Sequence, residues 1–168
     1  KIAFGDGSLA ELPDALASLG ARSALVVVEE PVAGHADVVA ALAAAEAAGV
    51  RVSSFVKGPG EPSFALADEL AARVRAESLD AVVGIGGGSA LDVAKASRIA
   101  ADQGGSIAEY ASGARTPEPP RDPVQPRCDH GGEREVRVHV AARNPGLDAA
   151  RLPAADDPEA ARAGVVAP

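Results

Sequence analysis

Large aromatic and sulfur-containing side chains are nearly absent from this sequence of 168 residues. It has no tryptophan and no methionine, and aromatic residues make up 2% of the chain. The hydrophobic fraction of 47% is sufficient for a core, which must therefore be built from alanine, valine and leucine. The length allows one ordinary domain and no more.

Cysteine, long apolar runs and positive charge are also scarce. The single Cys128 excludes an internal disulfide framework and is typical of a reducing cytoplasm. No apolar run reaches the roughly 18 residues that suggest a membrane-spanning helix, and residues 1–5 have no secretion-signal pattern. A net charge of −8 argues against a nucleic-acid partner or an acidic membrane surface. We therefore expect a cytoplasmic protein, and the missing initial methionine indicates a start inside a longer chain or a trimmed start.

Strand and helix patterns alternate over residues 1–113. Continuous apolar strands between amphipathic helices indicate a parallel sheet that is covered on both faces. We therefore predict an α/β fold, a Rossmann-like doubly wound parallel sheet, with ligands at the carboxyl ends of its strands. The predicted strands are 24–28, 50–56 and 81–85, and the predicted helices are 8–19, 35–48, 63–76 and 89–102.

Polar residues mark the expected helix starts. Ser8 with Glu11, and Ser89 with Asp92, have the spacing of a capping box. Ser63 precedes another helical pattern as a predicted N-cap.

The most informative segment is 80–96, DAVVGIGGGSALDVAKA. An apolar strand pattern ends there in Gly86, Gly87 and Gly88, and Ser89 opens a helix. Glycines let the backbone approach a phosphate closely, and the free N–H groups of a first helical turn bind anions. The segment therefore predicts an anion site, whereas a tight turn without a ligand is the alternative. The usual dinucleotide fingerprint fits only if serine replaces its last glycine.

The motif GGGSALDVAKA resembles the GGGSxxDxAKA signature of the iron-containing alcohol dehydrogenase family. Residues 5–13 and 19–28 resemble the opening turn, helix and strand of this family, and the resemblance covers residues 1–113. It implies an NAD-dependent, metal-dependent oxidoreductase that transfers hydride between a small alcohol or aldehyde and nicotinamide. This chain would be the cofactor-binding half of such an enzyme. The resemblance also implies a homo-oligomer. A noncatalytic nucleotide-binding fragment is one alternative. A glycerol dehydrogenase-like or dehydroquinate synthase-like enzyme is another.

The resemblance also implies which residues bind the cofactor. Gly87, Gly88 and Ser89 would hold the pyrophosphate, and Asp92 would lie near the nicotinamide. Glu29 ends a predicted strand where the family usually has aspartate. A carboxylate there accepts the ribose hydroxyls and repels a 2′-phosphate, which favours NAD over NADP. If the strand ends one residue later, the neighbouring Glu30 would take the place of Glu29 at the ribose. Alternatively, Glu29 is only a solvated acid in a loop.

Metal ligands are not expected in this chain. The resembled family holds iron or another divalent metal with one aspartate and three histidines on a helical domain that follows the cofactor domain. The only histidines here are His35, His130 and His139, and they have no such spacing. We therefore predict no metal site and no catalytic residue in this sequence.

The composition changes in residues 114–168. Isoleucine, phenylalanine, tyrosine and lysine do not occur there, whereas nine of the 13 prolines do. Apart from a strand pattern at 136–140, we expect an irregular, disordered tail rich in proline, arginine and alanine. A shifted reading frame is our hypothesis for its origin: codons for Asp129-His130-Gly131-Gly132, read one base out of register, can give the Thr-Thr-Ala-Gly of a loop found in the resembled family.

Overall fold

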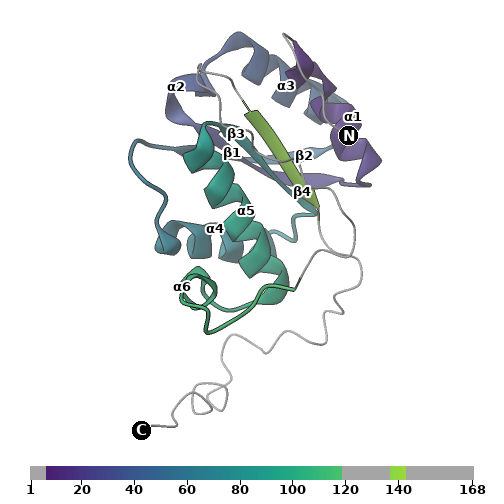
Figure 1. Cartoon of the computed structure of the whole chain (residues 1–168). Helices are drawn as coiled ribbons and strands as arrows, with labels where there is room; N and C mark the ends of the chain where they lie inside the picture. Colours follow the sequence, from purple (N-terminus) through teal and green to yellow (C-terminus); the bar gives the residue numbers. More distant parts are fainter. Residues whose placement is uncertain (1–6, 119–136, 143–168) are drawn as a thin grey trace, which may run out of the picture.

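The computed structural model describes residues 7–118 and the strand residues 137–142. The described strands form one sheet in the order β2-β1-β3-β4 (Figure 1). Strands β1 (Ser23–Glu29), β2 (Arg51–Lys57) and β3 (Ala81–Gly86) are parallel, and β4 (Arg137–Ala142) is antiparallel to β3. The predicted α/β fold with a Rossmann-like parallel sheet is confirmed.

Helices connect the parallel strands, because parallel neighbours require a crossover connection. Each predicted helix is present, although the boundaries differ by a few residues. The helices are η1 (Ser8–Glu11), α1 (Leu12–Ser18), α2 (Glu30–Ala33), α3 (Ala36–Ala47), α4 (Phe64–Ala76), α5 (Gly88–Gln103) and α6 (Ile107–Ala111).

Apolar side chains cover both faces of the sheet, because successive side chains of a strand point to opposite faces. In β1, Val26 and Val28 pack with α1 and α3, whereas Leu25 and Val27 pack with α4 and α5. Figure 1 shows these two pairs of helices on opposite sides of the strands. The buried hydrophobic residues of the described part are alanine, valine, leucine and isoleucine, with no aromatic residue among them.

The helix starts follow only part of the capping pattern. Ser63 caps α4, since its Oγ accepts a hydrogen bond of 3.1 Å from the backbone N–H of Leu66. Gly20 follows α1 with φ of 66°, a left-handed conformation that ends helices. The predicted capping box of Ser8 with Glu11 is wrong, because Gly7 is the N-cap of a 3-10 turn that no side chain of the described residues caps. A proline in the first turn of α1 sets the start of that helix instead.

Two parts of the predicted tail form hydrogen bonds with the α/β fold. The Gln103 side chain at the end of α5 donates to the carbonyl of Glu118 and accepts from its N–H, both at 2.9 Å. Strand β4 coincides with the strand pattern at 136–140 and pairs along the whole length of β3. The remaining residues, 119–136 and 143–168, lie outside the described residues, as does the sequence on which the reading-frame hypothesis depends.

Candidate functional site

The carboxyl ends of β1 and β3 lie side by side at the centre of the sheet. From β1 the chain moves outward to β2 on one side and then crosses to β3 on the other side. Such a reversal creates a crevice at the carboxyl ends of the two strands, and ligands of open α/β sheets bind there. Glu29 ends one of these strands, and the glycine turn follows the other.

Glu29 and the glycine turn are in direct contact. The backbone N–H of Gly87 donates a hydrogen bond of 2.7 Å to Oε2 of Glu29. Gly86 has φ of 143°, and a Cβ atom at this position would lie 2.6 Å from Cβ of Glu29. Only glycine tolerates both this conformation and this approach. The second acid, Glu30, begins α2 instead, so the register that the sequence left open places Glu29 at the turn.

The start of α5 differs from the prediction. Gly87 is the N-cap, and no side chain caps the helix among the described residues. Ser89 therefore does not act as the N-cap, and its hydroxyl donates to the carbonyl of Gly60 at 3.3 Å. The first-turn N–H groups keep their capacity to bind an anion, because no capping oxygen takes it up. A Cβ at Gly88 would meet no atom of the described residues within 4 Å, so these residues leave space beside this turn.

Asp92 lies one turn into α5 and away from this contact. Its Oδ1 is 3.4 Å from Nζ of Lys95, and the Asp92 side chain is 65% exposed. The predicted capping box of Ser89 with Asp92 is wrong, because the helix begins before Ser89. Asp92 faces solvent, and the structure does not bring it to Glu29 or to the glycine turn.

A loop from the edge strand reaches the start of α5, and its anchor was missed in the sequence. Lys57, the last residue of β2, is only 3% exposed. Its Nζ donates to the carbonyls of Gly58 at 3.1 Å and Gly60 at 2.7 Å. Gly60 also accepts from Ser89, so the loop joins the lysine to the glycine turn. The signal in the sequence is the alternation of β2, which places residues 53, 55 and 57 on one face.

The three histidines lie in separate parts of the sequence, and the structure describes the surroundings of one of their side chains, that of His35. The Nδ1 atom of His35 accepts from the N–H of Asp37 at the start of α3, and this side chain is exposed. His139 belongs to β4, where it pairs in register with Gly84, and His130 lies outside the described residues. Over the described part of the chain, no group of three or more histidine, cysteine or acidic side chains has a geometry suited to a metal.

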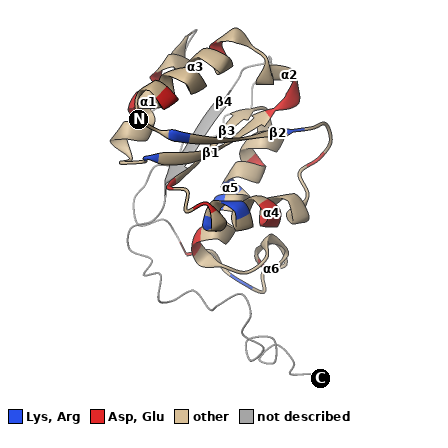
Figure 2. Ribbon diagram, turned by 180° about the vertical axis from the view of Figure 1, so that it is seen from behind, with Lys and Arg blue, Asp and Glu red and all other residues tan. Residues whose placement is uncertain are grey.

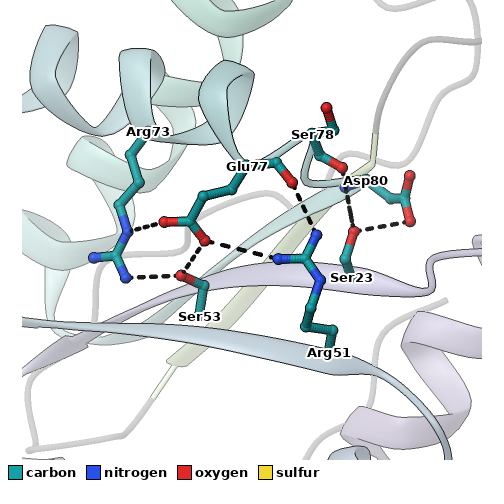
Figure 3. Close-up of polar contacts among 7 residues, drawn as sticks. All are labelled: Ser23, Arg51, Ser53, Arg73, Glu77, Ser78 and Asp80. Carbon is teal, nitrogen blue, oxygen red and sulfur yellow. Dashed lines mark hydrogen bonds and ion pairs between the residues drawn. The ribbon is translucent and has the colours of Figure 1, made fainter.

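A second polar cluster lies at the opposite, amino-terminal edge of the sheet (Figure 3). Oε2 of Glu77 accepts from the hydroxyl of Ser53 at 2.7 Å, and Oε1 accepts from Nε of Arg73 at 2.8 Å. The Ser53 hydrogen bond, followed by that of Arg73, lowers the pKa of Glu77 below its ordinary value. These contacts tie α4 to β2, and they use the carboxylate for interactions within the protein.

The neighbouring Asp80 joins β1 to β3 at the same edge. Its Oδ2 accepts from the hydroxyl of Ser23 and from the backbone N–H of Arg22, both at 3.0 Å. Burial raises the pKa of Asp80, but these hydrogen bonds outweigh burial and leave the pKa below its ordinary value. The carboxylates of Glu77 and Asp80 at the amino-terminal edge are therefore used within the protein. At the carboxyl edge, no described side chain caps α5, and no described atom lies within 4 Å of an added Cβ at Gly88.

The sequence profile of the iron-containing alcohol dehydrogenase family matches residues 1–126, beyond the limit of residue 113 expected for the resemblance. An NAD-dependent methanol dehydrogenase from Bacillus methanolicus is 30% identical over 156 residues, which are 92% of this chain and 40% of that protein. A choline dehydrogenase from Bacillus subtilis is 32% identical over 111 residues, 65% of this chain and 27% of that protein. The chain thus spans well under half the length of these curated relatives.

Solved structures show the same relationship. The NADH-dependent butanol dehydrogenase A of Thermotoga maritima superposes with a TM-score of 0.63 at 25% identity, over 70% of this chain and 30% of that one. The sulfoacetaldehyde reductase of Bifidobacterium kashiwanohense, solved with NAD+, gives a TM-score of 0.58 at 29% identity, over 66% and 29% of the two chains. Among the described helices of this chain, none combines the length and apolar composition needed to cross a bilayer.

Proposed function

Because this chain belongs to the iron-containing alcohol dehydrogenase family, we propose that its carboxyl-edge crevice binds NAD(H) for the oxidation of a small alcohol or the reduction of an aldehyde. The dinucleotide-binding unit includes the described residues 7–118. The nicotinamide carries the hydride, and the protein binds and orients the cofactor.

The contact between Glu29 and Gly87 carries this proposal. Its length of 2.7 Å brings the predicted ribose ligand next to the predicted pyrophosphate ligands, although the two residues are 58 positions apart in the sequence. A carboxylate beside glycines at a helix start matches the two ends of an adenosine diphosphate group, because ribose hydroxyls donate to carboxylates and phosphates accept from N–H groups.

Each predicted ligand has a separate role in this proposal. The N–H groups of Gly88 and Ser89 hold the pyrophosphate, and Gly87 adds its own N–H when Glu29 turns toward the ribose. The carboxylate of Glu29 favours NAD, since it repels the additional 2′-phosphate of NADP. Asp92 is exposed one turn further along α5, and we propose that the nicotinamide end of the extended cofactor lies near it.

The described residues do not fit the divalent metal that the family name implies. They contain no group of three or more suitable ligands. The proposed contribution of the described residues is therefore cofactor binding.

Isothermal titration with NADH and NADPH tests the proposal. We expect NADH to bind more tightly than NADPH, and Glu29→Gln to weaken NADH binding. Arg51→Gln, at the other end of the sheet, is the matched control and should leave binding unchanged. Tighter binding of NADPH, or no binding of either nucleotide, would contradict the proposal.

A further inference from the structure

Lys57 stands out because it is a buried cation at an acidic edge. The segments that begin at the last residue of each parallel strand are 29–35, 57–63 and 86–89, and Lys57 is the only lysine or arginine in them. The same segments contain three carboxylates, Glu29, Glu30 and Glu61. In Figure 2 the ribbon is red at α2 and in the loop after β2, and blue where β2 runs into this loop.

The register of the sheet places Lys57 beside the proposed ribose ligand. Lys57 of β2 pairs with Glu29 of β1, so their Cα atoms are neighbours on adjacent strands. Both side chains lie on the face that α4 and α5 cover, because they continue the alternation of Phe55 and Val27. The ammonium group is therefore on the same side of the sheet as the start of α5.

Hydrogen bonds connect this ammonium to the glycine turn. The carbonyl of Gly60 accepts from Nζ of Lys57 at 2.7 Å and from Oγ of Ser89 at 3.3 Å. The two donors thus share one acceptor atom, and Ser89 is a proposed pyrophosphate ligand. The described partners of Nζ are uncharged carbonyls, so its charge is not neutralised by a carboxylate within the described part of the chain.

A buried ammonium without a carboxylate partner is costly, and a nearby anion reduces this cost. A pyrophosphate, in turn, needs positive charge to enter an edge that has three carboxylates. We infer that Lys57 is a specificity-determining residue of the dinucleotide site, whose buried charge attracts the pyrophosphate and offsets the surrounding acids. This inference rests on the proposed function, because it assigns a residue to that same site.

The test compares ADP, which has the pyrophosphate, with adenosine, which does not. Lys57→Gln removes the charge but keeps an N–H donor for the carbonyls of Gly58 and Gly60. We expect it to weaken ADP binding about tenfold in titration calorimetry, since charges interact strongly in a partly desolvated site. Adenosine binding should change by less than about twofold, because no phosphate is involved. Lys57→Arg keeps the charge and should restore most of the ADP affinity.

Two controls make the outcomes distinct. Arg51→Gln removes one positive charge at the opposite end of the same strand and should leave both affinities unchanged. Circular dichroism and thermal unfolding show whether each variant folds. Equal losses for ADP and adenosine in Lys57→Gln would mean that Lys57 only holds the loop, and unchanged ADP affinity would mean that its charge is not used. Either result overturns the inference while leaving the proposed function in place.

The salt dependence of the wild-type chain tests the same inference without a substitution. If Lys57 dominates the potential at the pyrophosphate, added salt should weaken ADP binding, because screening reduces an attraction. If the carboxylates dominate, salt should strengthen ADP binding, and the inference fails. Failure of the wild-type chain to bind ADP and NADH at all would instead overturn the proposed function, and the inference with it.

Discussion

Replacement of Gly88 by alanine is expected to raise stability and to lower cofactor affinity. Gly88 is the first residue of α5, and an added Cβ atom meets no atom within 4 Å in the part of the chain that the structure describes. Alanine restricts the unfolded chain more than glycine does, so we expect a gain of about 0.4–1 kcal/mol in the free energy of unfolding. For a domain of this size, the melting temperature should rise by about 2–6 °C.

The same substitution should lower the affinity for the cofactor, although it raises the stability. The space beside Gly88 is where the proposed pyrophosphate approaches the backbone, and a methyl group would occupy it. We expect the affinity for NADH to fall by about tenfold or more, because the phosphate can no longer reach the first-turn N–H groups. Thermal unfolding by circular dichroism and titration calorimetry with NADH measure the two effects independently.

Gly86→Ala is the matched control for this experiment. Here the added Cβ would lie 2.6 Å from Cβ of Glu29, and φ of 143° is unfavourable for alanine. Backbone strain alone should cost about 1–3 kcal/mol, so stability and binding should fall together. A Gly88→Ala chain that binds NADH as the wild type does would refute the reasoning, because Gly88 would then not be close to the phosphate.

Four further predictions concern other parts of the chain. Glu29→Gly should narrow the preference for NADH over NADPH, because it removes the carboxylate that repels a 2′-phosphate; an unchanged affinity ratio in titration calorimetry would contradict this. Asp68→Ala should destabilise the chain by about 1–2 kcal/mol in urea and speed amide exchange in α6, whose first turn Asp68 binds through two hydrogen bonds. Because the folded-state pKa of Glu77 is lowered, this carboxyl stabilises the fold above its ordinary pKa, and that contribution is lost as pH falls through the lowered pKa. Ser53→Ala removes the hydrogen bond that lowers this pKa most, so acid unfolding, followed by circular dichroism, should shift to higher pH. Amides of 137–142 that point to β3 should exchange slowly in mass spectrometry, and immediate exchange would count against the pairing of β4.

The positions of β1 and β3 could be predicted because each is a continuous apolar run, which is typical of a strand covered on both faces. The edge strand β2 has polar residues among its apolar ones, and its side chains alternate between the two faces of the sheet. The ends of the three observed strands differ from the expected ones by at most one residue. The glycine turn could also be predicted, because consecutive glycines between a strand and a helix indicate a backbone conformation or a close approach that other residues do not tolerate. The contact of Glu29 with Gly87 follows from the pairing of β1 with β3, which the individual patterns do not specify.

Capping patterns were less reliable, for a physical reason. Spacing alone does not fix the residue at which a helix begins. At Ser63 the helix begins at the next residue, so the hydroxyl accepts from the N–H of Leu66. The helix α5 begins at Gly88, so Ser89 lies inside its first turn, and its hydroxyl donates to the carbonyl of Gly60. Lys57 was missed because lysine side chains are rarely buried, and its burial here depends on the conformation of the loop that follows it, in which the carbonyls of Gly58 and Gly60 accept from Nζ.

The arrangement of charges at the carboxyl edge is a consequence of the apolar register below it. Because β1 lies between β2 and β3, its last residue, Glu29, has Lys57 on one side and the glycine turn on the other. A slip of one residue in β1 would exchange its two faces and place Val28 or Glu30 at this point. That slip is prevented by the burial of β1 on both faces, where Leu25 and Val26 are fully buried in opposite layers. The hydrophobic strands therefore hold the acid, the cation and the open helix start together, and core substitutions that shift β1 should change nucleotide binding even where they do not touch the site.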